Sequence, residues 1–153
     1  MKPVRVTIDV PHPIEQVFDY LDVMSNHEPF TNHMLQDWEY SGPDRGIGSK
    51  ARVTVKAGGR SEKVDIEVIA AERPHSIVEQ NVSAGGKRIG TGTYTLHELP
   101  DRHTRIAFEY AWRRSLVSDR VAAPLVRAIL RRGNQRAMER LAEQLAQQPA
   151  AVA

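Results

Sequence analysis

The feature that most constrains this 153-residue chain is a change in the period of its hydrophobic residues. Between residues 4 and 10, and again between 34 and 112, apolar and polar residues alternate, which is the pattern of strands buried on one face. Turn-forming residues interrupt the second stretch about every 8–12 residues, as in antiparallel meanders. From residue 118 to about 147 the apolar residues recur every three or four positions, which predicts one long helix. We therefore expect an α+β fold with an antiparallel sheet.

These periods predict the bounds of the strands and helices. The strands are expected at residues 4–10, 34–40, 49–57, 61–72, 76–82, 88–99 and 103–112. After the first strand, the helical spacing of Ile14, Val17 and Leu21 predicts a short helix, and residues 22–30 predict a second. Pro124 is expected in the first turn of the C-terminal helix. The buried stripe of that helix is expected to be Leu125, Val126, Ile129, Leu130, Gly133, Ala137, Leu141 and Leu145.

Length and composition indicate a single globular domain. Chains of about 100–150 residues usually hold one core, and 41% of these residues are hydrophobic. We expect the domain at residues 1–148 and a frayed tail at 149–153. The absence of cysteine excludes disulfides, thiolate zinc sites and a cysteine nucleophile. Neither a signal-peptide core nor an apolar run of about 18–20 residues occurs in the sequence, so a cytoplasmic protein is expected.

Positive charge is concentrated near the C-terminus. The formal net charge is +2, but residues 113–140 hold eight arginines against two acidic residues, so this stretch carries +6 and the remainder −4. A solvated helix face is the favoured explanation of such a run. The alternative is a phosphate-bearing partner, either nucleic acid or an anionic membrane, held by Arg127, Arg131 and Arg136. Because the apolar stripe is needed for the core, no second hydrophobic face is expected to insert into lipid.

Motifs of metal, nucleotide and nucleophilic chemistry do not occur in the sequence. The six histidines lack a metal-binding spacing and are interpreted as solvated turn residues. No nucleophile elbow or phosphate-binding loop is present, so neither a metal nor a cofactor is predicted. Gly90 and Gly92 lie inside a strand pattern and are interpreted as a bend or bulge. Glu79 would be a functional candidate if it pointed inward, but a surface position is the favoured interpretation.

Five segments together resemble the START-like or helix-grip superfamily. They are residues 10–21 (VPHPIEQVFDYL), 46–53 (GIGSKARV), 72–77 (ERPHSI), 92–96 (GTYTL) and 104–106 (TRI). Each encodes only a turn or a strand end, but their order and spacing cover nearly the whole chain. Within the superfamily, the chain resembles the bacterial polyketide cyclase/dehydrase and lipid-transport (SRPBCC) family. This resemblance implies a helix-grip fold, in which a curved seven-stranded antiparallel sheet surrounds a long C-terminal helix, with two short helices after the first strand.

The resemblance also implies a cavity between sheet and helix that binds a hydrophobic small molecule, such as a lipid, polyketide or quinone. Most of the nine aromatic residues lie on elements that would enclose this cavity, and Gly133 would leave room on the facing helix. Filling of that space by side chains of the sheet is an equally weighted alternative. The predicted ligand-binding residues are Phe30, Trp38, Val53, Val55, Ile66, Tyr94, Phe108, Tyr110, Trp112, Ile129 and Gly133.

Two other functions stay open. A cyclase/aromatase or dehydratase of the same superfamily would need a general acid or base facing the cavity, and no catalytic residue is assigned. An interaction protein would use the basic helix on RNA, the ribosome or an anionic surface. Oligomeric state is also open, because the strand at residues 34–40 could pair with another chain but carries no clear signal for doing so.

Overall fold

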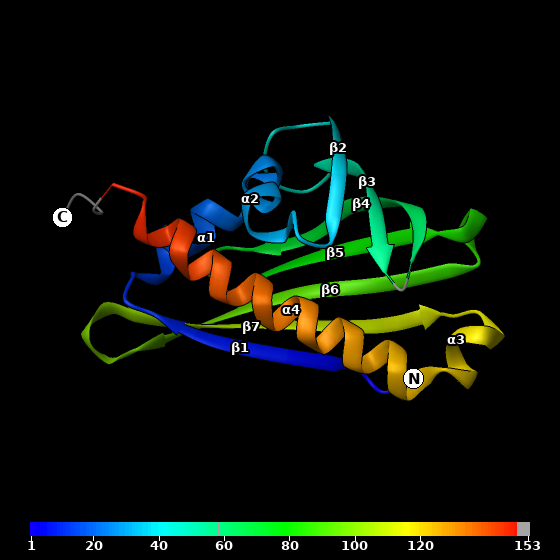
Figure 1. The fold of residues 1–153 in the computed structure, drawn as a ribbon. Coiled ribbons are helices and arrows are strands. Elements are labelled where there is room, and N and C mark those ends of the chain that lie inside the picture. The colour runs from blue at the N-terminus through cyan, green and yellow to red at the C-terminus, as the bar shows by residue number, and fades with distance from the viewer. Residues whose placement is uncertain (58, 150–153) are drawn as a thin grey trace.

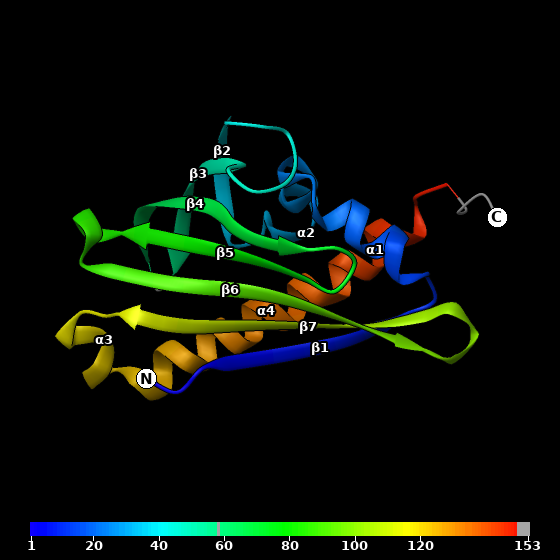
Figure 2. The ribbon, with the colours of Figure 1, turned by 180° about the vertical axis from the view of Figure 1, so that it is seen from behind.

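One antiparallel sheet with a long helix across one face makes up the fold in a computed structural model that describes residues 1–57 and 59–149 (Figure 1). The strand order is β1-β7-β6-β5-β4-β3-β2, so β1 and β2 are the edges. Seen from behind, strands β5, β6, β7 and β1 lie in front of the long helix (Figure 2). The strands are β1 (Val4–Val10), β2 (Leu35–Ser41), β3 (Lys50–Ala57), β4 (Arg60–Glu72), β5 (Ser76–Ser83), β6 (Arg88–Leu99) and β7 (His103–Arg114). The predicted helix-grip fold of the α+β class is confirmed.

The helices begin where the prolines predict. Pro13 directly precedes the first helix, and Pro124 lies in the first turn of the last, where the missing N–H costs no helical hydrogen bond. The helices are α1 (Ile14–Leu21), α2 (Glu28–Thr31), α3 (Val117–Val121) and α4 (Ala123–Ala146), with 3₁₀ turns η1 (Met24–His27), η2 (Ala84–Gly86) and η3 (Pro100–Arg102). Of the tail predicted at residues 149–153, residues 150–153 lie outside the described part of the chain.

The strand register places an apolar row on the face of the sheet that α4 crosses. Directly paired residues share a face, so Val6, Phe108 and Tyr94 lie side by side across β1, β7 and β6. Ile77 of β5 continues the row because it pairs with Tyr94. All four side chains are buried and belong to one core with the apolar side of α1, including Phe18. Alternation along each strand therefore builds the core in the way that the sequence predicts.

Only the second half of α4 packs into this core. Its buried residues are Asn134, Ala137, Met138, Leu141 and Leu145. None of residues 123–133, all of which the structure describes, is buried, and Leu125 is 63% exposed and Ile129 41%. The predicted buried stripe is therefore wrong for the first half of the helix. Steps of four drift by about 40° each around a helix of 3.6 residues per turn, so Leu125 and Ile129 point away from the side of Leu141, whereas Val126 and Leu130 lie near that side and are half-buried.

Two glycines of β6 make room for aromatic rings of β7. A Cβ at Gly90 would overlap the phenol ring of Tyr110, and a Cβ at Gly92 would lie 3.0 Å from two ring atoms of Phe108. The register of β6 against β7 also shifts between Ile89 and Gly90. The predicted bulge is confirmed, and the absence of side chains at the two glycines lets the rings approach the backbone of the neighbouring strand closely.

Gly92→Ala is expected to lower the free energy of unfolding by about 1–3 kcal/mol, because the added methyl group overpacks a site bounded by a buried ring. Phe108 is only 8% exposed and cannot turn away. Gly133→Ala is the matched control, since its Cβ would meet the Met34 sulfur at 2.9 Å. That thioether is flexible, and alanine gains about 1 kcal/mol of helix propensity over glycine. Urea unfolding of both variants tests the contrast, and equal losses would contradict it.

Candidate functional site

A row of polar side chains lies on the inner face of β5. Glu79 pairs with Gly92 and Asn81 with Gly90, so both share the face over which the rings of β7 lie. Ser83 continues the row and is buried, as is Glu79 with only 6% of its surface exposed. The favoured interpretation of Glu79 as a surface residue is therefore wrong, because the parity that it shares with Ile77 takes it inward.

His27, in turn η1, meets Glu79 at one end of this row. Its Nδ1 lies 3.1 Å from Oε1 of Glu79, and both side chains are almost fully buried. On the other side of the ring, Nε2 lies 2.7 Å from the carbonyl oxygen of Leu21. Phe30 and Tyr94 flank the imidazole, with ring centroids 5.3 and 5.5 Å from it. The interpretation of the histidines as solvated turn residues is wrong for His27, which is a core residue with an ionic partner.

The contacts of His27 determine its protonation. A carbonyl oxygen can only accept, so Nε2 carries a proton and donates it to Leu21. Burial alone would lower the pKa of His27, but the Glu79 carboxylate and the Leu21 carbonyl outweigh burial and raise that pKa above its usual value. His27 thus favours the imidazolium form beside the carboxylate. Besides His27, no described residue donates a hydrogen bond to Oε1 of Glu79.

Further along β5, the oxygen Oδ1 of Asn81 is buried and has no hydrogen-bond partner among the described residues. Buried polar atoms in native proteins nearly always have a partner. Nearby, burial raises the pKa of Tyr94 well above its ordinary value, and the charge of Glu79 adds to the effect. Its phenol therefore stays neutral at physiological pH. The inner face thus combines a neutral donor, an ion pair and the unused acceptor oxygen of Asn81 within an apolar surface.

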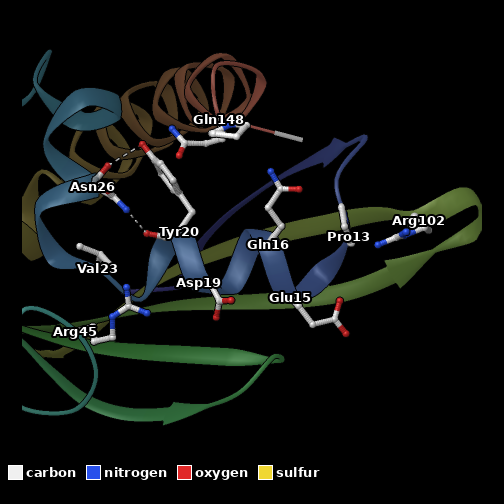
Figure 3. A pocket seen from close by; sticks show the side chains of 11 residues that line it. Pro13, Glu15, Gln16, Asp19, Tyr20, Val23, Asn26, Arg45, Arg102 and Gln148 are labelled. Atoms are coloured by element: carbon white, nitrogen blue, oxygen red, sulfur yellow. Dashed lines mark hydrogen bonds between the residues drawn. The ribbon is translucent and has the colours of Figure 1, made fainter. Parts of the chain in front are cut away.

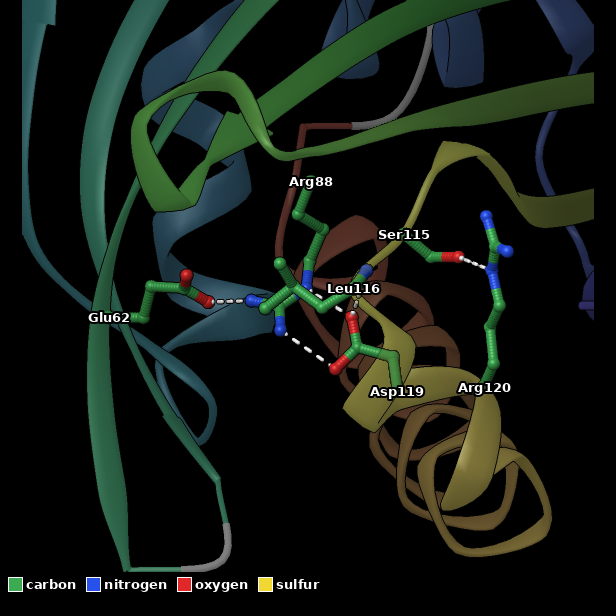
Figure 4. Close-up of polar contacts among 6 residues, drawn as sticks. All are labelled: Glu62, Arg88, Ser115, Leu116, Asp119 and Arg120. Atoms are coloured by element: carbon green, nitrogen blue, oxygen red, sulfur yellow. Dashed lines mark hydrogen bonds and ion pairs between the residues drawn. The ribbon is translucent and has the colours of Figure 1, made fainter.

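A second ionic cluster links α3 to the sheet (Figure 4). Arg88 of β6 donates to both carboxylate oxygens of Asp119, at 2.8 Å each, and also to Glu62 of β4. The backbone N–H of Leu116 donates to Asp119 as well, at 3.3 Å. The hydrogen bonds from Arg88 hold the pKa of Asp119 below its usual value, so this carboxylate stays charged. The cluster attaches the short helix α3 to the same end of the sheet as Ser83.

The predicted ligand-binding residues fall into two groups. Five are buried in the side-chain core: Phe30, Val53, Ile66, Tyr94 and Phe108. Six are partly or largely exposed: Trp38, Val55, Tyr110, Trp112, Ile129 and Gly133. Met34 takes up the room that Gly133 was expected to leave, since its sulfur lies 2.9 Å from the position of a Cβ. The first group already packs against other side chains, whereas the second still has surface to offer a ligand.

Two pockets lie elsewhere on the described part of the protein. One, of about 490 Å³, lies beside α1, where Tyr20 donates to the carbonyl oxygen of Asn26 at 3.2 Å and Asn26 donates back to Tyr20 at 2.9 Å (Figure 3). The other, of about 480 Å³, lies on the outer face of β2–β5 around the ion pair of Arg52 with Asp65. Neither is the predicted space between the sheet and α4.

Several polar groups of α4 form hydrogen bonds with other segments of the protein. Arg127 donates to the carbonyl oxygens of Lys2 and Pro3, at 3.0 and 3.2 Å, so it anchors the N-terminus. His33 has Nε2 2.9 Å from the carbonyl oxygen of Gly133 and Nδ1 2.9 Å from Arg140. These contacts join the segment after α2 to α4. They leave Arg131 and Arg136 as the exposed members of the predicted phosphate-binding set.

Among residues 1–57 and 59–149, no group of three or more His, Asp and Glu side chains could hold a metal ion. None of the described helices is long and apolar enough to cross a bilayer.

An antiparallel sheet that holds a long C-terminal helix, with polar groups on an otherwise apolar inner face, defines a helix-grip protein. The family model described as polyketide cyclase / dehydrase and lipid transport matches residues 1–147, and the chain belongs to this family. No curated protein matches the sequence.

Solved structures share the fold at low identity. The protein TTHA0849 from Thermus thermophilus is 16% identical, with 95% of this chain and 97% of that chain covered and a TM-score of 0.73. The Zhui aromatase/cyclase from Streptomyces is 13% identical, with 95% and 93% covered and a TM-score of 0.73. Protein MLL2253 from Mesorhizobium loti is 19% identical, with 97% and 99% covered and a TM-score of 0.68. At these identities the likeness is one of fold.

Proposed function

We propose that the protein binds a hydrophobic small molecule, such as a lipid, a polyketide or a quinone-like compound, between the sheet and the first half of α4. Membership of a polyketide cyclase/dehydrase and lipid-transport family supports this class of ligand. The observation that carries the proposal is the incomplete packing of the inner face at one end. There Val126 and Leu130, which lie near the inward side of α4, are only half-buried, as are Tyr110, Trp112, Val55 and Val64 of the sheet.

Incomplete packing of this kind is unusual for aromatic and branched side chains. Protein interiors are close-packed, and partly exposed apolar surface on two facing elements loses hydrophobic free energy of about 25 cal/mol per Å² unless something covers it. At the other end of the molecule, Leu141 and Leu145 of the same helix are completely buried. A hydrophobic ligand in the first half would continue the core that these residues form in the second.

The polar row of β5 indicates what the ligand carries. The unpartnered oxygen of Asn81 needs a hydrogen-bond donor. Binding sites for small molecules are mostly apolar with a few well-placed polar groups that set orientation. The ligand that fits best is therefore a largely apolar molecule with a hydroxyl or N–H group on the edge that faces β5.

Native mass spectrometry of the protein purified from its own host tests the proposal. We expect a retained mass on the wild-type chain, and Asn81→Leu should lower its occupancy about tenfold because a ligand donor then loses its acceptor. Gln80→Leu is the matched control, since Gln80 lies on the opposite face of the same strand and should leave occupancy unchanged. A wild-type protein without retained mass, or equal effects of both variants, would contradict the proposal.

A cyclase or dehydratase is the second candidate, and the buried pair of His27 with Glu79 is what favours it. An imidazolium and a carboxylate 3.1 Å apart can supply and accept a proton at the inner end of the site. Turnover of a poly-β-ketone by the wild-type chain would support this function. If the pair is catalytic, Glu79→Gln should stop turnover while the retained mass persists, whereas unchanged turnover would exclude Glu79 from the chemistry.

A further inference from the structure

Exposed apolar side chains gather on α3 and the start of α4. Seven large hydrophobic residues of the described chain are exposed, and four of them lie within thirteen positions. These four, which we call the apolar ridge, are Val117, Val121, Leu125 and Ile129, exposed by 73%, 80%, 63% and 41%. Single exposed hydrophobic residues need no explanation, but a group of them on consecutive elements marks an interaction surface.

The ridge is directed away from the core. Leu125, Ile129, Arg132 and Arg136 recur at steps of four, three and four, so they share one side of α4. A helix of 3.6 residues per turn rotates by about 40° at each step of four, so Leu141 lies about 160° around α4 from Leu125, and the buried residues Ala137, Leu141 and Leu145 follow the opposite side. Val117 and Val121 are likewise one turn apart on α3. The expectation that the helix offers no second hydrophobic face is therefore wrong, since its first half has one.

Uncompensated positive charge surrounds the ridge. Arg114 donates to the carbonyl oxygen of Gly86 and Arg120 to the hydroxyl of Ser115, at 3.1 Å each, and both partners are neutral. Asp119 cannot offset these charges because Arg88 already binds it (Figure 4). Arg136 lies 3.9 Å from Glu139, so the exposed cations of this stretch without an acidic partner are Arg113, Arg114, Arg120, Arg131 and Arg132. The surface therefore combines apolar side chains with a strong positive charge.

We propose that this surface docks onto an anionic lipid bilayer, with the apolar ridge in the acyl boundary and the arginines at the headgroup phosphates. Surface-bound amphipathic helices combine apolar residues and flanking arginines in this way. RNA would match the arginines but would leave the aliphatic ridge against phosphate and sugar. A second copy of the chain would cover the ridge but would bring two sets of arginines together. The bilayer is the occupant that satisfies both features.

The attachment of α3 to the sheet orders the docking surface before it binds a bilayer, which lowers the entropic cost of binding. The hydrogen bonds from Arg88 to Asp119 fix α3 against β6, so Val117 and Val121 do not need to be ordered on binding. Residues 123–133 also border the incompletely packed part of the interior. The docking surface rests on the exposed residues alone, and it holds whether or not a ligand occupies that interior.

Flotation of the full chain with phosphatidylcholine vesicles, with and without phosphatidylglycerol, tests the proposal. We expect binding only when phosphatidylglycerol is present. Val121→Ser/Leu125→Ser should weaken the partition coefficient about tenfold through lost apolar contact. Arg120→Gln/Arg132→Gln should weaken it about tenfold at low salt and much less at high salt, where the charges are screened.

Control variants change the same residue types elsewhere. Ile47→Ser/Ile69→Ser removes two other exposed apolar side chains, and Arg5→Gln/Lys63→Gln removes two exposed cations of the outer sheet face. Both controls should float like the wild type, and unchanged urea midpoints should show that all variants fold. Binding to RNA without binding to vesicles, or a dimer that the Val121/Leu125 variant dissociates, would overturn the proposal. So would vesicle binding that either test variant leaves unchanged.

Discussion

His27→Leu is expected to lower the free energy of unfolding by about 3–5 kcal/mol at pH 7, because it leaves the carboxylate of Glu79 buried without its cation. Glu79 is 6% exposed, and Arg88 of the nearest ionic cluster is engaged by Glu62 and Asp119. Leucine fills much of the volume of imidazole, so the loss comes mainly from the stranded charge. Urea unfolding of the variant measures it.

Glu79→Leu should cost less than His27→Leu. Without the carboxylate, His27 can lose a proton and remain as a neutral ring that still donates from Nε2 to Leu21. The double variant His27→Leu/Glu79→Leu should recover to within about 1–2 kcal/mol of the wild type, because apolar residues often replace a buried ion pair at little net cost. Additive losses in this double-mutant cycle would show that the two groups do not interact.

The pair of His27 with Glu79 should also make the free energy of unfolding depend on pH, with a contribution that falls as the pH rises. Because the pKa of His27 is raised in the folded state, its contribution is fully present below the unfolded value of about 6.5. That contribution is then lost as the pH rises through the higher folded pKa. Each unit of pKa rise corresponds to about 1.4 kcal/mol. Glu79→Gln removes the charge while keeping the shape, so the stability difference between wild type and variant should shrink above pH 6.5. A difference that grows there would contradict this assignment.

Local sequence signals were sufficient to predict the strands. The bounds of β1 and β6 agree with the predicted ranges 4–10 and 88–99, since alternation and turn residues act within a few positions. The last strand extends to Arg114 rather than ending at residue 112. Its final residues are charged and exposed, so no apolar alternation marks them.

The candidate site was less predictable because it depends on contacts between distant residues. His27 lies in a polar segment near Pro29, and nothing local shows that Glu79 of β5 will reach it. The signal that could have found the pair was the parity of Glu79 with Ile77, which places a carboxylate on a buried face. Such a carboxylate needs a partner. A search for that partner among the histidines would have included His27.

Leu141→Ala is expected to lower the free energy of unfolding by about 2–5 kcal/mol, because it opens a cavity under a side chain with no exposed surface. Leu125→Ala, the same substitution in the same helix, should change it by less than about 0.5 kcal/mol, since Leu125 is 63% exposed. Urea unfolding of the two variants compares the halves of α4 directly.

The comparison also tests why the predicted stripe was wrong for half of the helix. The predicted stripe ignored the drift of about 40° at each step of four, and if that stripe were right, both leucines would belong to one core and both substitutions would be costly. A loss confined to Leu141 would show that the sheet holds α4 through residues 134–145, where the buried residues lie. The first half would then contribute little to stability, and its apolar side chains would be free to contact a partner outside the fold. Equal losses would instead mean that the first half packs on the sheet in solution, which would remove the apolar ridge as a docking surface.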